Sequence, residues 1–104
     1  MRALPHLPVT ETLPALKSTL TRVGAAVLVA PPGAGKTTLV PLALLDEPWA
    51  TGTILLLEPR RLAARAAARR MSSLLGEEVG STVGYAMRLD AHTSSGTRIL
   101  VVTE

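Results

Sequence analysis

The chain has 104 residues, enough for one domain of modest size. Its apolar content is 47% but aromatic residues make up only 2%, so we expect a core of Leu, Val, Ile and Ala. The absence of cysteine excludes disulfides, thiolate metal sites and cysteine nucleophiles. The formal net charge is +3, and five of the eleven Lys and Arg residues lie between Arg60 and Arg70, which indicates a local basic surface.

The N-terminal region carries no targeting signal that the sequence makes visible. No apolar run approaches the ~20 residues of a membrane span, and the first residues lack the apolar segment of a signal peptide. We therefore expect a cytoplasmic protein without a membrane partner. Pro5 and Pro8 predict an irregular arm over residues 1–8, and residues 9–104 are expected to form the domain.

The first half of that domain is expected to run helix, strand, loop, helix. A helix from Thr10 to about Arg22 would carry Pro14 in its first turns and end at Gly24. The continuous apolar run at residues 25–29 predicts a strand buried on both faces. After a Pro/Gly loop, a second helix is expected over residues 35–45, bent by Pro41.

The second half is expected to hold one long helix among three strands. The helix would cover residues 60–75 and end at Gly76. Apolar runs predict strands at 53–57 (buried) and 98–103. A further short strand is expected at 84–89, and residues 90–96 are expected to be a polar turn. Strands that alternate with helices indicate an α/β fold with a mainly parallel sheet flanked by helices. Because the sequence stops directly after an apolar strand, we expect a fragment of a longer domain.

The segment Ala30–Thr37 (APPGAGKT) fits the P-loop pattern, with Ala30 in place of the first glycine. Its glycines let backbone N–H groups approach phosphate oxygens, and the following helix would point its N-terminus at the same anion. Lys36 would reach the β- and γ-phosphates, and the Thr37 hydroxyl would hold Mg²⁺. The predicted phosphate-binding residues are Pro32, Gly33, Ala34, Gly35, Lys36, Thr37 and Thr38.

Two other interpretations of this loop fit the sequence less well. A plain Gly/Pro turn before a helix is possible for any short motif, but the expected strand before the loop and helix after it favour the P-loop. The dinucleotide-binding pattern GxGxxG fails, because Thr38 stands at its third glycine position.

The long helix carries a stripe of positive charge. Arg61, Arg65 and Arg69 repeat at i, i+4 with Ser72 beside them. For Arg65 and Arg69, a solvated polar face explains the charge as well as contact with a ligand does. The opposite, core-facing arc is expected to hold Ala63, Ala66, Ala67, Met71 and Leu74.

Arg60 and Arg61 lie where a strand passes into a helix, at the sheet edge where α/β proteins bind ligands. Paired arginines there suit the phosphate backbone of a nucleic acid. Arg70 falls inside the alanine-rich arc, so a structural ion pair with Glu58 or Glu104 is expected. Trp49 is expected to pack over a helix end, and His92 to be a surface histidine.

Four segments in order, APPGAGKTTLVPLALL, ILLLEPRRLAARAAARRM, VGYAMRLD and RILVVTE, resemble the first RecA-like domain of the DEAH-box helicases. Within that family the bacterial HrpB-type ATP-dependent helicases are the most similar group. The resemblance covers about residues 8–104. It implies a partial RecA-like P-loop NTPase domain that uses ATP and Mg²⁺ and belongs to a hydrolase.

The resemblance also implies roles for single residues. Lys36 and Thr37 would act in catalysis within the ATP-binding motif, while Arg60, Arg61 and Thr103 would follow the backbone of single-stranded RNA, or DNA. Gly84, Tyr85 and Arg88 match a segment that is usually structural or strand-adjacent. Ala30 replaces a common glycine, and Leu57-Glu58 replaces a common Thr-Gln.

The family's DEAH segment and its second RecA-like domain with arginine fingers do not occur in these 104 residues. We therefore expect the chain alone to lack hydrolysis and unwinding, which depend on all parts together. A P-loop kinase and a non-catalytic nucleotide-binding module remain as alternatives. RNA binding that weakens with salt would argue against the kinase.

Overall fold

The computed structural model describes residues 8–28 and 37–103. Contacts divide the chain into two compact units, Met1–Ala50 and Thr51–Glu104, and each is described by itself. No helix among the described residues is long and apolar enough to cross a membrane. Of the irregular arm expected at residues 1–8, residues 1–7 lie outside the described residues, and Pro8 begins a 3-10 helix.

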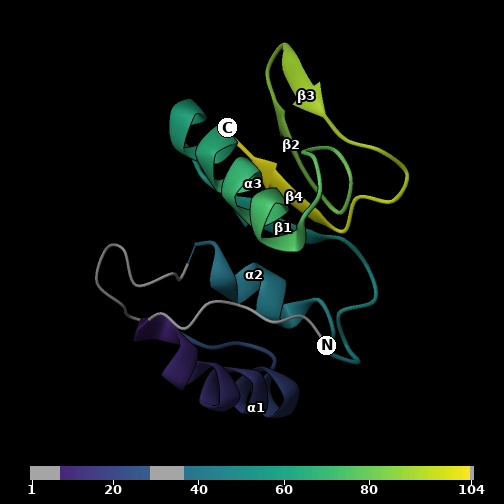
Figure 1. Ribbon diagram of the computed structural model, residues 1–104. Coiled ribbons are helices and arrows are strands. Elements are labelled where there is room, and N and C mark those ends of the chain that lie inside the picture. The colour runs from purple at the N-terminus through teal and green to yellow at the C-terminus, as the bar shows by residue number, and fades with distance from the viewer. Residues whose placement is uncertain (1–7, 29–36, 104) are drawn as a thin grey trace. The chain divides into compact units, whose positions relative to one another are not determined.

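The first unit contains a 3-10 helix η1 (Pro8–Thr12) and the helices α1 (Leu13–Val23) and α2 (Leu39–Leu44) (Figure 1). Helix α1 has Pro14 in its first turn, where the missing N–H is tolerated. It ends at Gly24, as predicted, whose φ of 88° suits glycine and whose N–H bonds the Leu20 carbonyl at 2.9 Å. The buried side chains Leu39 and Leu42 of α2 supply the core of this unit.

Two predictions for the first unit are wrong. Residues 25–28 form no strand, and Val27 is 92% exposed. A strand needs a hydrogen-bonded neighbour, and the described part of this unit has none, so an apolar run alone was insufficient. Helix α2 begins at Leu39 rather than at residue 35, although residues 35–36 are not described. Pro41 therefore lies in the first turn, where it interrupts no helical hydrogen bond.

The second unit is a four-stranded sheet with α3 (Arg61–Leu75) against it. The strands are β1 (Ile54–Leu57), β2 (Val83–Met87), β3 (Asp90–His92) and β4 (Ile99–Val102), in the order β1-β4-β2-β3. β4 is parallel to both β1 and β2, and β3 is antiparallel to β2. The mainly parallel α/β sheet flanked by helices is thus confirmed.

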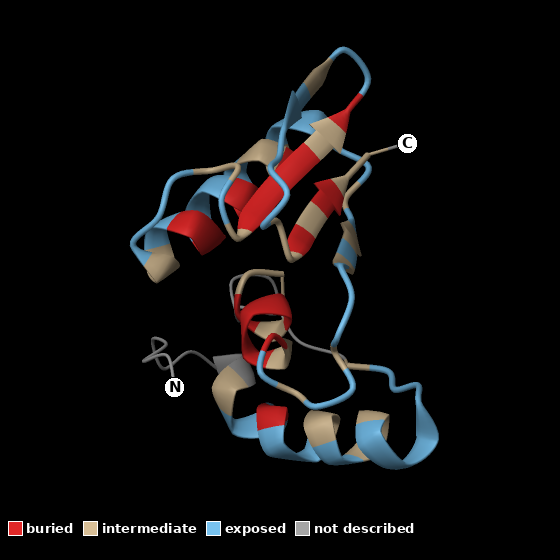
Figure 2. Ribbon diagram, turned by 90° about the vertical axis from the view of Figure 1, so that its right-hand side faces the viewer, coloured by how far each residue is buried: buried red, intermediate tan, exposed pale blue. Residues whose placement is uncertain are grey.

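The core of this unit lies between α3 and the strands β2 and β4 (Figure 2). Small alanines bring the helix close to the sheet, as the composition predicted. Its fully buried apolar side chains are Ala64, Ala68, Met71, Val83, Ile99 and Val101. Helix α3 ends at Gly76, as predicted, in a left-handed cap with a φ of 71°.

The face of α3 that meets the sheet differs from the predicted arc. Ala66 is exposed and Ser72 is buried, the reverse of the expectation. The helix is rotated so that Ala64, Ala67 and Ala68 form the contact. A pure 100° projection could not fix this rotation, since so many alanines surround the helix.

One strand prediction and one turn prediction also need correction. β1 is not buried on both faces, since Leu55 and Leu57 are 67% and 62% exposed and β1 is an edge strand of the described sheet. The polar turn expected at residues 90–96 contains β3, which forms a hairpin with β2 through Arg88 and Leu89.

Candidate functional site

The predicted phosphate-binding residues fall mostly outside the described chain. This applies to Pro32, Gly33, Ala34, Gly35 and Lys36, of which nothing structural is said. Thr37 and Thr38 form a half-buried turn that leads directly into α2, and Thr38 makes no side-chain cap bond. The described residues contain no group of three His, Cys, Asp or Glu that could hold a metal ion.

The carboxyl ends of β1 and β4 bring the predicted nucleic-acid residues to one edge of the sheet. The two strands are parallel, with Leu57 opposite Val102. The pairing continues past β1, because the Glu58 N–H donates to the Val102 carbonyl at 2.9 Å. Arg60 and Arg61 follow Glu58, and Thr103 follows Val102, so all three leave the sheet at the same edge.

Arg60 is hydrogen-bonded to Glu58, which stands where the helicases that the sequence resembles commonly have Gln. Glu58 Oε1 accepts one bond from the Arg60 backbone N–H and one from its Nε, each at 3.1 Å. The bond from the Arg60 side chain is the main reason that the pKa of Glu58 lies below its ordinary value. The Arg60 side chain is nevertheless 79% exposed, so it remains accessible to an anion while Glu58 restrains it.

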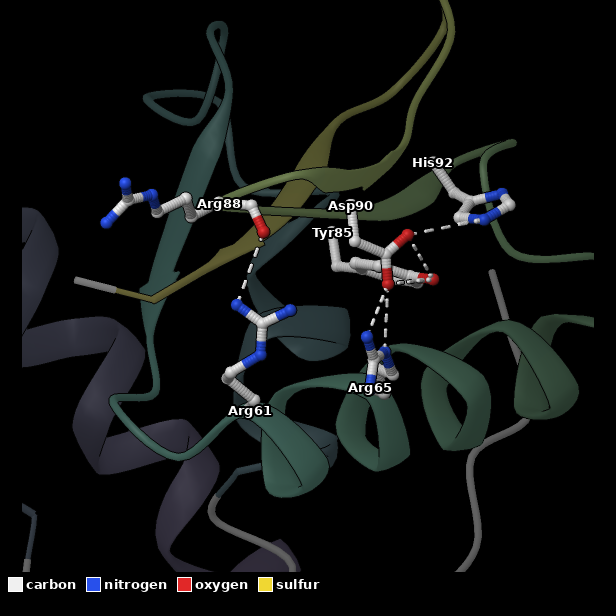
Figure 3. A network of polar contacts seen from close by, with 6 residues as sticks. All are labelled: Arg61, Arg65, Tyr85, Arg88, Asp90 and His92. Carbon is white, nitrogen blue, oxygen red and sulfur yellow. Dashed lines mark hydrogen bonds and ion pairs between the residues drawn. The ribbon is translucent and has the colours of Figure 1, made fainter.

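Arg61 reaches across to the hairpin of β2 and β3. Its Nη1 donates to the backbone carbonyl of Arg88 at 3.3 Å (Figure 3). The arginine itself is exposed. One end of its planar guanidinium is therefore held by a carbonyl, and its further donors are available for an anion.

One turn further along α3, Arg65 pairs with Asp90 of β3. Its Nη2 and Nε lie 2.6 and 3.0 Å from Asp90 Oδ2. The Tyr85 hydroxyl lies 3.4 Å from both carboxylate oxygens, and His92 Nε2 lies 3.8 Å from Oδ1 (Figure 3). Arg65 is the largest cause lowering the pKa of Asp90, and Asp90 in turn raises that of Arg65.

The sequence did not predict this network. For Arg65 the sequence leaves a solvated helix face and an anion contact equally open, and it predicts that Asp90 lies in a turn. The spacing of Arg61 and Arg65 on one helix face is the available signal, but it does not identify their partners, because residues 90–96 are expected to form a turn and not part of a hairpin. His92 is a surface histidine, 59% exposed, although its ring lies 5.1 Å from that of Tyr85.

Three more predicted residues can be placed. Thr103 Oγ1 is buried and has no hydrogen-bond partner among the described residues, so its bonding capacity is unused. Trp49 donates from Nε1 to Thr21 Oγ1 at 3.1 Å, near the end of α1, in agreement with packing over a helix end. The ion pair expected for Arg70 is wrong as regards Glu58: Arg70 is exposed and Glu58 bonds Arg60 instead.

Comparison with known proteins gives extended matches. The ATP-dependent RNA helicase HrpB of Escherichia coli K12 is 51% identical over 98 residues, which are 94% of this chain and 12% of that protein. The human ATP-dependent RNA helicase DHX33 is 37% identical over 99 residues, 94% of this chain and 14% of its own length. No protein-family profile matches the chain.

Solved structures agree with these matches. A crystal structure of the E. coli DEAH/RHA helicase HrpB superposes with a TM-score of 0.90 at 51% identity, over 94% of this chain and 12% of that one. A second, of the E. coli DExH-box NTPase HrpB, gives 0.90 at 50% identity, over 100% and 13%. The chain thus spans about an eighth of the length of these HrpB chains.

Proposed function

We propose, from the premise that this chain belongs to the HrpB-type group of DEAH-box helicases, that it is the ATP-binding and RNA-contacting part of an ATP-dependent RNA helicase. The observation that carries the proposal is the 51% identity to E. coli HrpB over 94% of the chain. In this proposal residues 9–104 are the first part of a RecA-like domain, whose remaining partners are the rest of a helicase chain and a second RecA-like domain. The proposed compartment is the cytoplasm.

The nucleotide would be bound by the loop that precedes α2. Backbone N–H groups of Pro-Gly-Ala-Gly segments of this kind cradle phosphates, although Pro32 itself has no N–H to give. Lys36 would neutralise the β- and γ-phosphates. In P-loop NTPases Mg²⁺ is held by a Ser or Thr hydroxyl of the loop and a separate Asp, together with phosphate oxygens, so the Thr37 hydroxyl would supply one ligand of this ion. When bound, Mg²⁺ supplies charge neutralisation at the phosphates.

The nucleic acid would lie at the sheet edge formed by the ends of β1 and β4. Arg60 and Arg61 are both exposed there, and guanidinium groups suit the paired oxygens of a phosphodiester. Thr103 would add a hydroxyl contact, which requires rotation of its buried Oγ1. Contacts of this kind carry no base sequence information, so we propose a backbone-directed site for single-stranded RNA, or DNA.

Binding of ATP by the 104-residue chain tests the first half of the proposal. Titration with a fluorescent ATP analogue and Mg²⁺ should give saturable binding that Lys36→Ala weakens roughly ten- to a hundredfold, the usual worth of a hydrogen bond to a charged group. Lys17, the other lysine of the chain, lies in α1 beside Glu47 at 3.7 Å. Lys17→Ala is the matched control and should bind nearly as the parent does.

Hydrolysis by the same chain should be negligible. The sequence contains no Asp-Glu-Ala-His segment, and phosphoryl transfer needs magnesium-holding and water-positioning groups and arginine fingers together. Phosphate release with Mg-ATP should equal that of Lys36→Ala. Release well above that variant would show that the chain carries a catalytic set that we have not assigned.

RNA binding tests the second half. The affinity for a single-stranded oligonucleotide should fall with salt, and Arg60→Gln or Arg61→Gln should reduce the slope of log K against log salt by about 0.7 for each lost phosphate contact. Arg70→Gln removes the same charge from an exposed position of α3. An equal effect of this control would refute a defined site at the sheet edge.

A further inference from the structure

Helix α3 is joined to the β2–β3 hairpin at two successive turns. Arg61 donates to the backbone carbonyl of Arg88 at 3.3 Å, and Arg65 donates twice to Asp90 Oδ2, at 3.0 and 2.6 Å. Figure 3 shows the two bridges side by side, with the Arg88 side chain pointing away from Arg61. The tip of the hairpin is thus bonded to α3, the helix that carries Arg61, a proposed RNA contact.

The tip itself has a costly backbone conformation. Met87 and Asp90 pair across the hairpin, so Arg88 and Leu89 form its turn. Leu89 has a φ of 65°, a region that costs an L-residue with a Cβ free energy and persists only where its surroundings impose it. The Leu89 side chain is 98% exposed, so its own packing does not hold the turn.

Rotation of the peptide unit between Arg88 and Leu89 changes both the direction of the Arg88 carbonyl and the φ of Leu89. If this unit rotated so that Leu89 took a negative φ, the carbonyl would turn away from Arg61. The bond from Arg61 therefore exists only while the turn is kept in its left-handed form. The residue that follows Leu89 directly is Asp90, whose carboxylate is fixed by Arg65 and lies 3.4 Å from the Tyr85 hydroxyl.

We propose that Arg65 and Asp90 are positioning residues for nucleic-acid binding: their ion pair holds the hairpin tip so that the Arg88 carbonyl fixes the Arg61 guanidinium for a phosphate of single-stranded RNA. This inference rests on the proposed function, because it takes Arg61 to be a phosphate contact. Neither Arg65 nor Asp90 touches the RNA in this arrangement. They contribute by ordering Arg61 before binding, which lowers the entropy that binding has to remove.

Removal of Asp90 gives the proposal a test with an unambiguous sign. Asp90→Ala deletes a negative charge near a polyanion site, so simple electrostatics predicts tighter RNA binding. The positioning role predicts the opposite, a Kd for a single-stranded oligouridine raised about threefold to tenfold, as expected for loss of one pre-ordered long side chain. Glu78→Ala is the matched control, since Glu78 is exposed in the same unit and should leave binding equal or slightly tighter.

A double-mutant cycle separates positioning from a general loss of structure. Asp90→Ala should add nothing to Arg61→Gln, because its effect passes through Arg61, and should add fully to Arg60→Gln. Should Asp90→Ala fold poorly by circular dichroism, the isosteric Asp90→Asn is used in the same cycle. Binding by Asp90→Ala and Asp90→Asn as tight as the parent's, or equal coupling to Arg60 and Arg61, would overturn the inference and leave the proposed function standing. Absence of RNA binding by the unmodified chain would overturn both.

Discussion

Gly84 in β2 lies directly against the backbone carbonyl oxygen of His92 in β3, so close that a Cβ on Gly84 would clash with that oxygen. The same Cβ would lie 3.2 Å from Thr93 Cγ2. Since Gly84 has no positive φ, the reason for glycine here is space. The small residue lets the hairpin strands that carry Tyr85 and Asp90 approach each other.

Gly84→Ala should therefore destabilise the second unit. A backbone oxygen cannot rotate away as a side chain can, so we expect a loss of about 1–3 kcal/mol, typical of overpacking. Thermal unfolding should show a fall in Tm of about 4–8 °C for each kcal/mol. Gly52→Ala is the control, since nothing lies within 4 Å of its added Cβ. A Tm for Gly84→Ala equal to that of Gly52→Ala would contradict the close approach.

The Arg65–Asp90 ion pair should make stability depend on acidity. Hydrogen bonding from Arg65 lowers the pKa of Asp90 in the folded protein, whereas an aspartate in the unfolded chain has a pKa of about 3.9. The stabilisation is thus fully present above about pH 4–5 and is lost as the pH falls through the lowered folded value. The difference in urea midpoint between the unmodified chain and Asp90→Asn should be largest at pH 7 and shrink at pH 3.

Two features allow the difference in urea midpoint to be assigned to Asp90. The pKa of Glu58 is also lowered, by Arg60, but this pair is present in both proteins and so cancels from the difference. Glu78→Gln changes the same charge at an exposed carboxylate and should show no such trend. A midpoint difference that stays constant from pH 7 to pH 3 would mean that ionisation of Asp90 does not contribute to the stability of the folded protein.

Much of the second unit could be predicted from the sequence, because its signals are local. Gly76 ends a helix, and apolar runs of about five residues mark β2 and β4. The run at residues 25–28 is just as apolar, yet it forms no strand. An apolar run becomes a strand only where a neighbouring strand can hydrogen-bond to it. The sequence of a single segment does not contain that information. The exposed face of β1 was missed for the same reason, since the position of a strand in the sheet order is not local.

The candidate site divides in the same way. The meeting of Arg60, Arg61 and Thr103 at one edge follows from parallel strands, and the bond from Glu58 to Val102 bears out that geometry. The link from Arg65 to Asp90 could not be derived, because it depends on the rotation of α3 and on an unexpected hairpin. Whether residues 32–38 bind phosphate stays a prediction.

The rotation of α3 can be tested with two alanines. Ala68 is fully buried and Ala66 is exposed, although the helical projection had put Ala66 on the core side. Ala68→Leu should cost about 1–3 kcal/mol by overpacking, while Ala66→Leu should change the free energy of unfolding by less than about 0.5 kcal/mol. Urea denaturation of both variants measures this. The reverse order would support the projection over the structure.

Leu89→Gly should stabilise the hairpin, although it removes a leucine. The side chain is 98% exposed, so almost no buried area is lost, and glycine adopts a φ of 65° without the Cβ penalty of roughly 1–2 kcal/mol. Against this stands a larger loss of backbone entropy on folding, about 0.5–1 kcal/mol. We expect a net gain of between zero and about 1.5 kcal/mol, measured by urea denaturation.

Leu89→Ala separates the backbone effect from the loss of the side chain. It removes most of the exposed leucine but keeps the Cβ, so it should not share the gain. Since glycine preserves the turn that orients the Arg88 carbonyl, Leu89→Gly should also retain the RNA affinity of the unmodified chain. If Leu89→Gly is no more stable than Leu89→Ala, the turn is not strained. Leu89 would then keep its positive φ without help from the contacts that Arg61 and Arg65 make with the hairpin.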